Sequence, residues 1–134
     1  MSRSVIQTAN TSEQTINDGG ILSPGAIIRR YGCNCQLNGN TFVLNGAGYY
    51  DISVNATVEP DAAGTVTLSV QQDGVILQGA EVSATVAAVD TSVPMPITPY
   101  VIRVYCCSPV SNISVILTGG SATVTNFAVS IRKD

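Results

Sequence analysis

Four cysteines are the most reactive side chains in this 134-residue chain, and they occur as two close pairs. Cys33 and Cys35 are separated by one residue, whereas Cys106 and Cys107 are adjacent. Structural zinc sites usually space their paired ligands by two to four residues, so neither pair predicts a zinc site. Two alternatives stay open. The cysteines are buried free thiols that act as small hydrophobic side chains, or a disulfide joins one pair to the other or joins two chains.

General acid–base chemistry lacks its usual residues. The chain has no His, which excludes Ser/His/Asp and Cys/His catalysis. Its carboxylates occur singly, and only Glu59-Pro60-Asp61 places two close together, as a weak pattern for Ca²⁺. We therefore expect no catalytic residue, no metal site and no cofactor, and we predict that the protein is not an enzyme.

The charge of the chain limits the classes of partner that it can bind. Six Lys and Arg against nine Asp and Glu give a net charge of −3, which argues against nucleic-acid binding. The pair Arg29-Arg30 either meets a carboxylate across a subunit contact or is simply solvated. No apolar run is long enough to span a membrane, and the polar start of the chain does not resemble a signal peptide. We expect neither a nucleic-acid nor a membrane partner.

The elements that must position these residues are strands. Val, Ile and Thr make up 42 of the 134 residues, and β-branched side chains favour a pleated sheet. In residues 49–58 apolar and polar side chains alternate for ten positions, and residues 65–71 and 81–89 repeat the pattern. We predict eight to ten short strands in an all-β, antiparallel β-sandwich, most simply a jelly roll. An immunoglobulin-like sandwich is the alternative, although its usual core Trp is absent.

Two parts of the chain differ in character. Residues 1–25 are polar with strong turn signals, so we predict an N-terminal tether or edge strand there and the jelly-roll domain in residues 26–134. Three prolines make residues 93–99 irregular. Residues 100–107 are nearly all apolar, and in residues 122–132 the alternation slips at Asn126, which indicates a β-bulge. The scarcity of charge and these two segments predict burial against another copy of the chain.

Three segments carry a family resemblance. Residues 46–53, which read Gly-Ala-Gly-Tyr-Tyr-Asp-Ile-Ser, open a long alternating strand, and residues 66–74 and 122–131 read as later strands of the same fold. They resemble the trimeric tumour-necrosis-factor-like jelly rolls, which include complement heads and the C-terminal domain of the collagen-like spore-surface glycoprotein of bacilli. Residues 24–33 and 104–107 resemble short stand-alone proteins of Firmicute bacteria and their phages. The chain has no collagen-like Gly-X-Y tract.

The resemblance implies both assembly and role. It implies a homotrimer, with a trimer contact that we expect to include Tyr105, Val124, Phe127, Val129 and Ile131. It also implies a structural knob on a phage virion surface, as a capsid decoration or fibre protein, attached to a capsid or other virion protein through residues 1–25. The alternative is a spore- or cell-surface head that recognises a glycan or a receptor.

Overall fold

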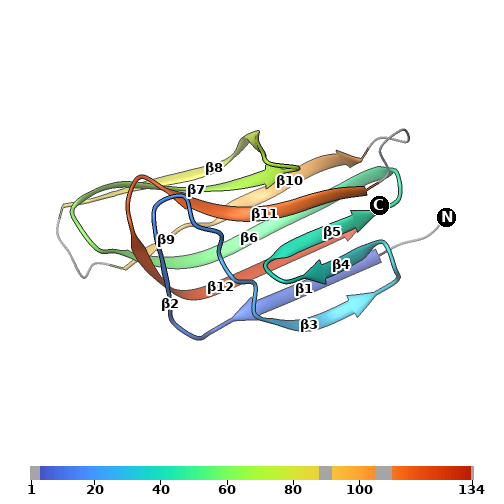
Figure 1. The fold of residues 1–134 in the computed structure, drawn as a ribbon, viewed down its shortest axis with the longest axis horizontal. Coiled ribbons are helices and arrows are strands. Elements are labelled where there is room, and N and C mark those ends of the chain that lie inside the picture. The colour runs from blue at the N-terminus through green and yellow to red at the C-terminus, as the bar shows by residue number, and fades with distance from the viewer. Residues whose placement is uncertain (1–3, 88–91, 105–109, 134) are drawn as a thin grey trace.

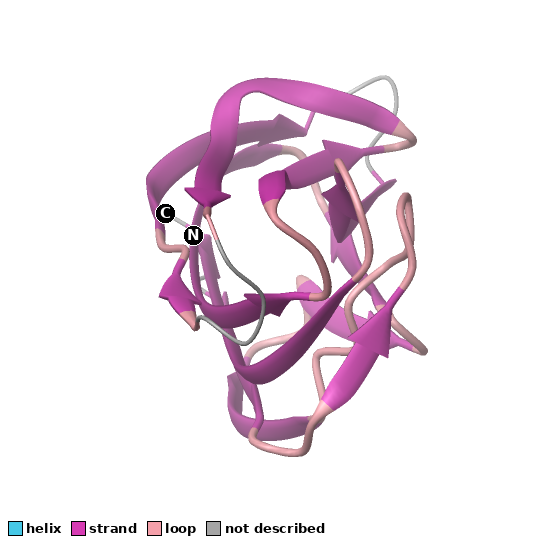
Figure 2. Ribbon diagram, turned by 90° about the vertical axis from the view of Figure 1, so that its left-hand side faces the viewer, coloured by secondary structure: helices cyan, strands magenta, loops and turns pink. Residues whose placement is uncertain are grey.

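A computed structural model describes residues 4–87, 92–104 and 110–133, which form two antiparallel sheets packed face to face (Figures 1 and 2). Sheet A has the spatial order β10 (Ile97–Val104), β6 (Gly48–Pro60), β12 (Ala122–Lys133), β1 (Ser4–Asn10) and β3 (Ala26–Tyr31), with β2 (Gln14–Ile16) beside β12 and β9 (Val93–Pro94) beside β6. Sheet B has the order β4 (Cys35–Asn38), β5 (Thr41–Asn45), β11 (Val110–Thr118), β7 (Gly64–Gln72) and β8 (Val75–Val86). The predicted antiparallel jelly-roll sandwich is confirmed. Its described part contains twelve strands, because four short ones join those that the pattern indicated.

The core lies between the two sheets and follows the alternation read from the sequence. In β6 every second residue from Tyr50 to Val58 is buried, and the residues between them face outward. Sheet B supplies the opposite side through residues such as Leu68 in β7 and Leu117 in β11, both fully buried. Each such buried aliphatic side chain contributes about 1.5–3 kcal/mol, so one continuous apolar layer stabilises the domain.

The bulge predicted in the last strand is confirmed. The register of β12 against β6 shifts between Val124, which pairs with Val58, and Asn126, which pairs with Thr57. One extra residue in β12 restores the inward phase, so that Phe127 and the alternate residues after it face the core again.

The N-terminal segment is part of the sandwich, which corrects the prediction of a tether or edge strand in residues 1–25. Strand β1 lies between β12 and β3 inside sheet A, and its Ile6 is fully buried. Further along, Leu22 donates its backbone N–H to Val115 O at 2.9 Å, which joins this segment to β11 in sheet B. Backbone hydrogen bonds to distant strands thus compensate for the low apolar content of the segment.

Two hairpins show how turn residues fix the register. One joins β7 to β8 through Asp73-Gly74, whose positive φ angles of 54° and 86° suit a two-residue turn. A second hairpin, β4–β5, was not predicted, although Asn38-Gly39 is a typical turn signal and Gly39 has φ 62°.

The proline-rich segment is more regular than its composition predicted. Strand β9 pairs with β6, and β10 already begins at Ile97, with a register shift before Tyr100. Strand β10 is an edge strand of sheet A, where the loss of one backbone N–H is tolerated.

Candidate interaction surfaces

The outward face of sheet A is lined at its centre by short or uncharged side chains. Strand register places Ser130 of β12 between Ser53 of β6 and Gln7 of β1, with Ala128 and Asn55 in the next outward row. We call these five residues the small-residue face. They border a shallow hollow of about 140 Å³, whose lining also includes Val54 and Val129.

This face is uncharged, which is one property that it shares with the cores of protein interfaces. None of its five side chains is charged, and the cores of protein interfaces are depleted of charged residues. Within the described part of the chain, the side chains of Gln7, Ser53 and Ser130 make no hydrogen bond to another residue. Short side chains also let a second protein backbone approach the sheet closely.

Four of the five residues predicted to form the trimer contact are buried inside the chain. The side chains of Val124, Phe127, Val129 and Ile131 are at most 1% exposed and lie in the core between the two sheets. They have no surface left for another copy, so the contact assignment for these four residues is wrong. Tyr105, the fifth predicted contact residue, lies outside the described residues.

One end of sheet A adds aromatic and charged side chains to the outward face. The Arg103 guanidinium lies 5.8 Å from the centre of the Tyr49 ring, which is a cation–π distance. Next to them, Val101 is 59% exposed, and Asp51 pairs in register with Arg132. The outward side of this segment is therefore not buried by the chain itself at Val101, and its burial against another copy stays a prediction.

The outward face of sheet B has a different organisation. Hydroxyl groups bond each other across β7 and β8, with Thr65 and Thr85 at 2.7 Å and Thr67 and Ser83 at 2.8 Å. This ladder satisfies polar groups on a face that is otherwise open to solvent.

The described cysteines have opposite environments. Cys33 is exposed and Cys35 is buried, and neither forms a disulfide with another described residue. Burial raises the pKa of Cys35 to about 11, although the nearby charges of Lys133 and Arg30 oppose the shift. Cys35 is therefore an unreactive core thiol at neutral pH. Cys106 and Cys107 lie outside the described residues, so a disulfide between the two pairs stays a prediction.

Tyr50 closes the end of the core beside Cys35. Its hydroxyl donates to the backbone oxygens of Asn45 and Gly46, with oxygen–oxygen distances of 2.9 Å and 2.7 Å. Burial raises the pKa of Tyr50 to about 12, and the neighbouring Cys35 thiol contributes to the rise. The hydroxyl therefore acts as a structural donor.

The other candidate residues from the sequence do not converge. Among the described residues, no group of three or more His, Cys, Asp or Glu side chains is arranged to hold a metal ion, the region of Glu59 and Asp61 included. Arg29 and Arg30 lie exposed on the edge strand β3. Nor do the described residues contain a helix that could cross a membrane.

Sequence reasoning missed the small-residue face, although part of its signal was visible. The alternation in residues 49–58 already placed Ser53 and Asn55 on the face opposite the core. Their meeting with Gln7 and Ala128 depends on pairing between strands that are far apart in the chain.

Comparison with known proteins identifies the class of fold. No protein-family model and no curated protein sequence matches the chain. Among solved structures, murine APRIL at pH 5.0 matches with a TM-score of 0.74 and 13% identity, over 99% of this chain and 100% of that chain. The globular domain of zebrafish complement 1qA matches with a TM-score of 0.70 and 10% identity, over 96% and 94% of the two chains. The PRD1 vertex protein P5 matches with a TM-score of 0.60 and 14% identity, over 97% and 96%.

These likenesses cover nearly the whole chain and define its architecture. The protein has the tumour-necrosis-factor-like and complement-head-like jelly-roll fold. At 10–14% identity the likeness concerns the fold alone. The resemblance to spore-surface glycoproteins and to short Firmicute or phage proteins stays a prediction.

Proposed function

We propose that the protein is a non-enzymatic, homotrimeric knob on the surface of a phage virion, where it serves as a capsid decoration or fibre protein. The jelly-roll fold supports the knob, and the match to a protein named for the vertex of PRD1 supports the virion setting. The small-residue face supports self-association.

The small-residue face is the observation that carries the self-association part of this proposal. Ser53, Ala128 and Ser130 form an uncharged strip along the middle of sheet A, beside the shallow hollow. A neighbouring copy would bury this strip and exclude water from it. In a closed ring of three, each copy supplies the same surfaces to its neighbours.

The attachment to the particle is proposed at the end where β1 begins. Ser4, the first described residue, pairs with Lys133 near the end of β12, so both ends of the described chain lie side by side (Figure 1). Because β1 is a full member of sheet A, we place the contact with the particle at this end of the sandwich rather than on a separate tether. A capsid or other virion protein is the partner.

Copurification tests the virion setting. Phage particles purified on a density gradient should contain the chain, and an antibody against it should label intact particles. The copy number per particle should be a multiple of three. Particles without the chain, or chain that is found only inside disrupted particles, would contradict the surface role. The mass of the purified protein tests the trimer separately.

A recognition head is the second candidate function, and a different surface favours it. Strand β3 carries Arg29 and the exposed ring of Tyr31 beside a hollow at the edge of sheet A. A knob fixed to a particle can also recognise a ligand, so the two functions are compatible.

A further inference from the structure

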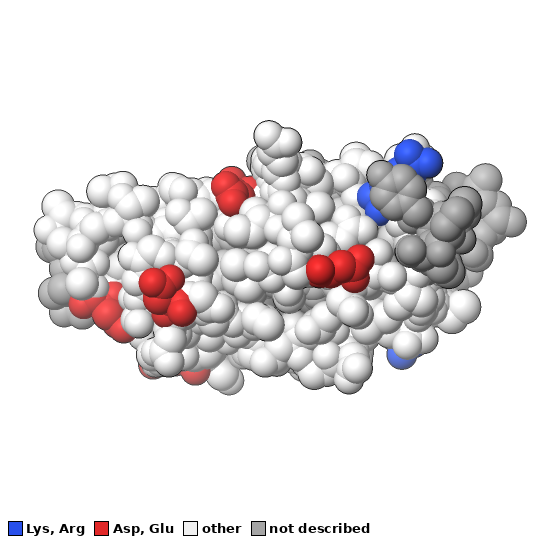
Figure 3. Space-filling model, turned by 45° about the horizontal axis from the view of Figure 1, so that its top comes forward, with Lys and Arg blue, Asp and Glu red and all other residues white. Residues whose placement is uncertain are grey.

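The basic side chains of the described residues gather at one end of sheet A. Arg103 lies near the end of β10, Arg132 and Lys133 end β12, and Arg29 and Arg30 lie near the end of β3. Strand pairing brings these ends together, and on the face shown in Figure 3 the blue side chains lie at one end whereas the red ones are spread along the rest. A chain with a net charge of −3 thus carries a locally positive end.

On the β3 side of this end the neighbouring strands hold no carboxylate, whereas on the β6 side Asp51 pairs in register with Arg132. Strands β1, β3 and β12 contain neither Asp nor Glu. Arg29 pairs in register with Gln7 of β1, and within the described residues its side chain makes no hydrogen bond or ion pair. Its guanidinium is therefore available to an external anion.

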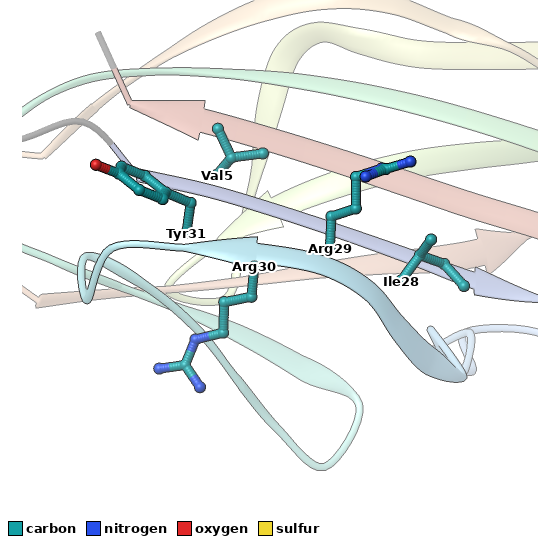
Figure 4. A pocket seen from close by; sticks show the side chains of 5 residues that line it. All are labelled: Val5, Ile28, Arg29, Arg30 and Tyr31. Atoms are coloured by element: carbon teal, nitrogen blue, oxygen red, sulfur yellow. The ribbon is translucent and has the colours of Figure 1, made fainter.

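A hollow of about 480 Å³ lies beside this guanidinium, lined by Val5, Ile28, Arg29, Arg30 and Tyr31. Figure 4 shows Val5, Arg29 and Tyr31 on one side of β3 and β1, whereas Arg30 projects to the other side. The register of β3 against β1 shifts at Ile28, which re-aims the strand and leaves this residue 55% exposed. The Tyr31 ring is 70% exposed and forms one wall.

We propose that this hollow binds an acidic sugar. Arg29 binds the sugar's carboxylate, because a planar guanidinium can donate two parallel hydrogen bonds to two carboxylate oxygens. Tyr31 packs its ring on the apolar C–H face of the sugar, and Val5 and Ile28 extend the apolar surface. The ligand must therefore carry a negative charge and an apolar face within one compact unit.

The size and charge of the hollow favour this occupant over larger anions. A volume of about 480 Å³ lies within the usual range for small-ligand sites, which is about 300–1,000 Å³. Nucleic acid would need a broad basic surface, and this chain is acidic overall. The site lies at the rim of the small-residue face, because Gln7 separates Arg29 from Ser130, and interface rims stay accessible to solvent. The inference goes beyond the attachment role and does not require it.

Calorimetric titration of the full chain at 150 mM salt tests the site. The probes are oligogalacturonate as the acidic sugar, polyglutamate of matched charge as a carboxylate polymer without sugar, and dextran as a neutral sugar. We expect oligogalacturonate to bind and the other two to bind at least tenfold more weakly. Arg29→Gln and Tyr31→Ala should each weaken oligogalacturonate binding about tenfold. Arg103→Gln removes the same charge at the opposite edge of sheet A and should change binding less than twofold.

Each alternative result overturns the proposal. No oligogalacturonate binding by the unmodified chain removes the site. If polyglutamate binds as tightly as oligogalacturonate, the surface binds acidic peptides instead. If Arg103→Gln weakens binding as much as Arg29→Gln does, the binding is only a general attraction between opposite charges. If Arg29→Gln lowers the oligomer mass in mass photometry of the same sample, the hollow belongs to a contact between copies. Failure of the virion proposal leaves all of these results unchanged.

Discussion

On the outward face of sheet B, Thr67 and Ser83 bond each other across β7 and β8 at 2.8 Å, and Thr65 and Thr85 do the same one step along. On the outward face of sheet A, the equivalent central positions hold Ser53 and Ser130, whose side chains bond no other described residue. Both faces belong to antiparallel sheets that cover the same core. They differ in whether the polar groups of a strand face are satisfied within the chain.

This difference in side-chain hydrogen bonding indicates which of the two faces stays in contact with solvent. On β8 the hydroxyl ladder consists of exposed side chains, and the next cross-strand pair along it includes the acidic Glu81. Exposed polar and charged side chains of this kind are typical of a face that stays in contact with water. The small-residue face offers neither charge nor internal bonding, and four of its five side chains are half-buried, so a second protein surface could cover it. In the proposed homotrimer, sheet B would therefore point outward and sheet A would point toward the neighbouring copies.

Substitution of Phe127 should give the largest change in stability. This residue lies on the inward side of β12, the strand whose outward side carries Ala128 and Ser130 of the small-residue face. Phe127→Ala removes a ring that is 1% exposed from the core and should lower the free energy of unfolding by about 3–5 kcal/mol. Urea denaturation at fixed protein concentration measures the loss, and Phe127→Leu provides a milder variant that keeps the fold. An unchanged midpoint with a loss of oligomer mass would instead place the ring at the contact.

Alkaline pH should give an intermediate loss of stability. It affects titratable groups in the core but none in the small-residue face. The unfolded chain releases the Cys35 proton near pH 9 and the Tyr50 proton near pH 10, whereas in the folded chain the pKa values are about 11 and about 12. The stabilisation is therefore complete below pH 9 and is lost as pH rises from 9 to 12. Thermal unfolding across this range should show the decrease.

Tyr50→Phe is the matched control for the alkaline prediction. It removes one titrating group, so the decrease should end near pH 11. The small-residue face holds no titratable side chain, so the oligomer mass should stay constant while the folded state persists. A mass that decreases at pH values where the unfolding temperature is still unchanged would contradict the assignment.

The hydroxyl ladder of sheet B gives the smallest effect. Thr67→Val removes one cross-strand hydrogen bond to Ser83 on a solvent-facing surface and should lower the free energy of unfolding by about 0.5–1 kcal/mol. Chemical denaturation reports the stability, and sedimentation should report an unchanged mass. A change of mass would mean that the face of sheet B also takes part in assembly.

The alternation in β6 and the bulge in β12 were predictable because both are local patterns. A period of two identifies a buried face, and a slip at Asn126 identifies the extra residue. The pattern does not say what buries that face. Phe127 and Ile131 were assigned to a subunit contact, but the chain's own second sheet covers them.

The N-terminal segment was misjudged for a related reason. Its few apolar residues indicated a tether, but its place in the fold depends on long-range bonds, such as the one from Gly119 N–H to the Asp18 carboxylate, 101 residues away. The hollow beside β3 also forms across two strands, since Val5 and Tyr31 meet only through the pairing of β1 with β3. Local residue types predicted Arg29-Arg30 as a charged pair but not its aromatic wall.

The most direct test of the central claim is a pair of identical substitutions on the two outward faces. Mass photometry of the unmodified chain should give about 42 kDa, three times the 13.9 kDa chain. Ser83→Glu, on the outward face of sheet B, should keep the trimer mass. Ser130→Glu places a carboxylate in the small-residue face and should give the 13.9 kDa monomer. The circular-dichroism spectrum of Ser130→Glu should be the same as that of the unmodified chain. A monomeric unmodified chain, or a trimer that survives Ser130→Glu as well as it survives Ser83→Glu, would contradict the claim.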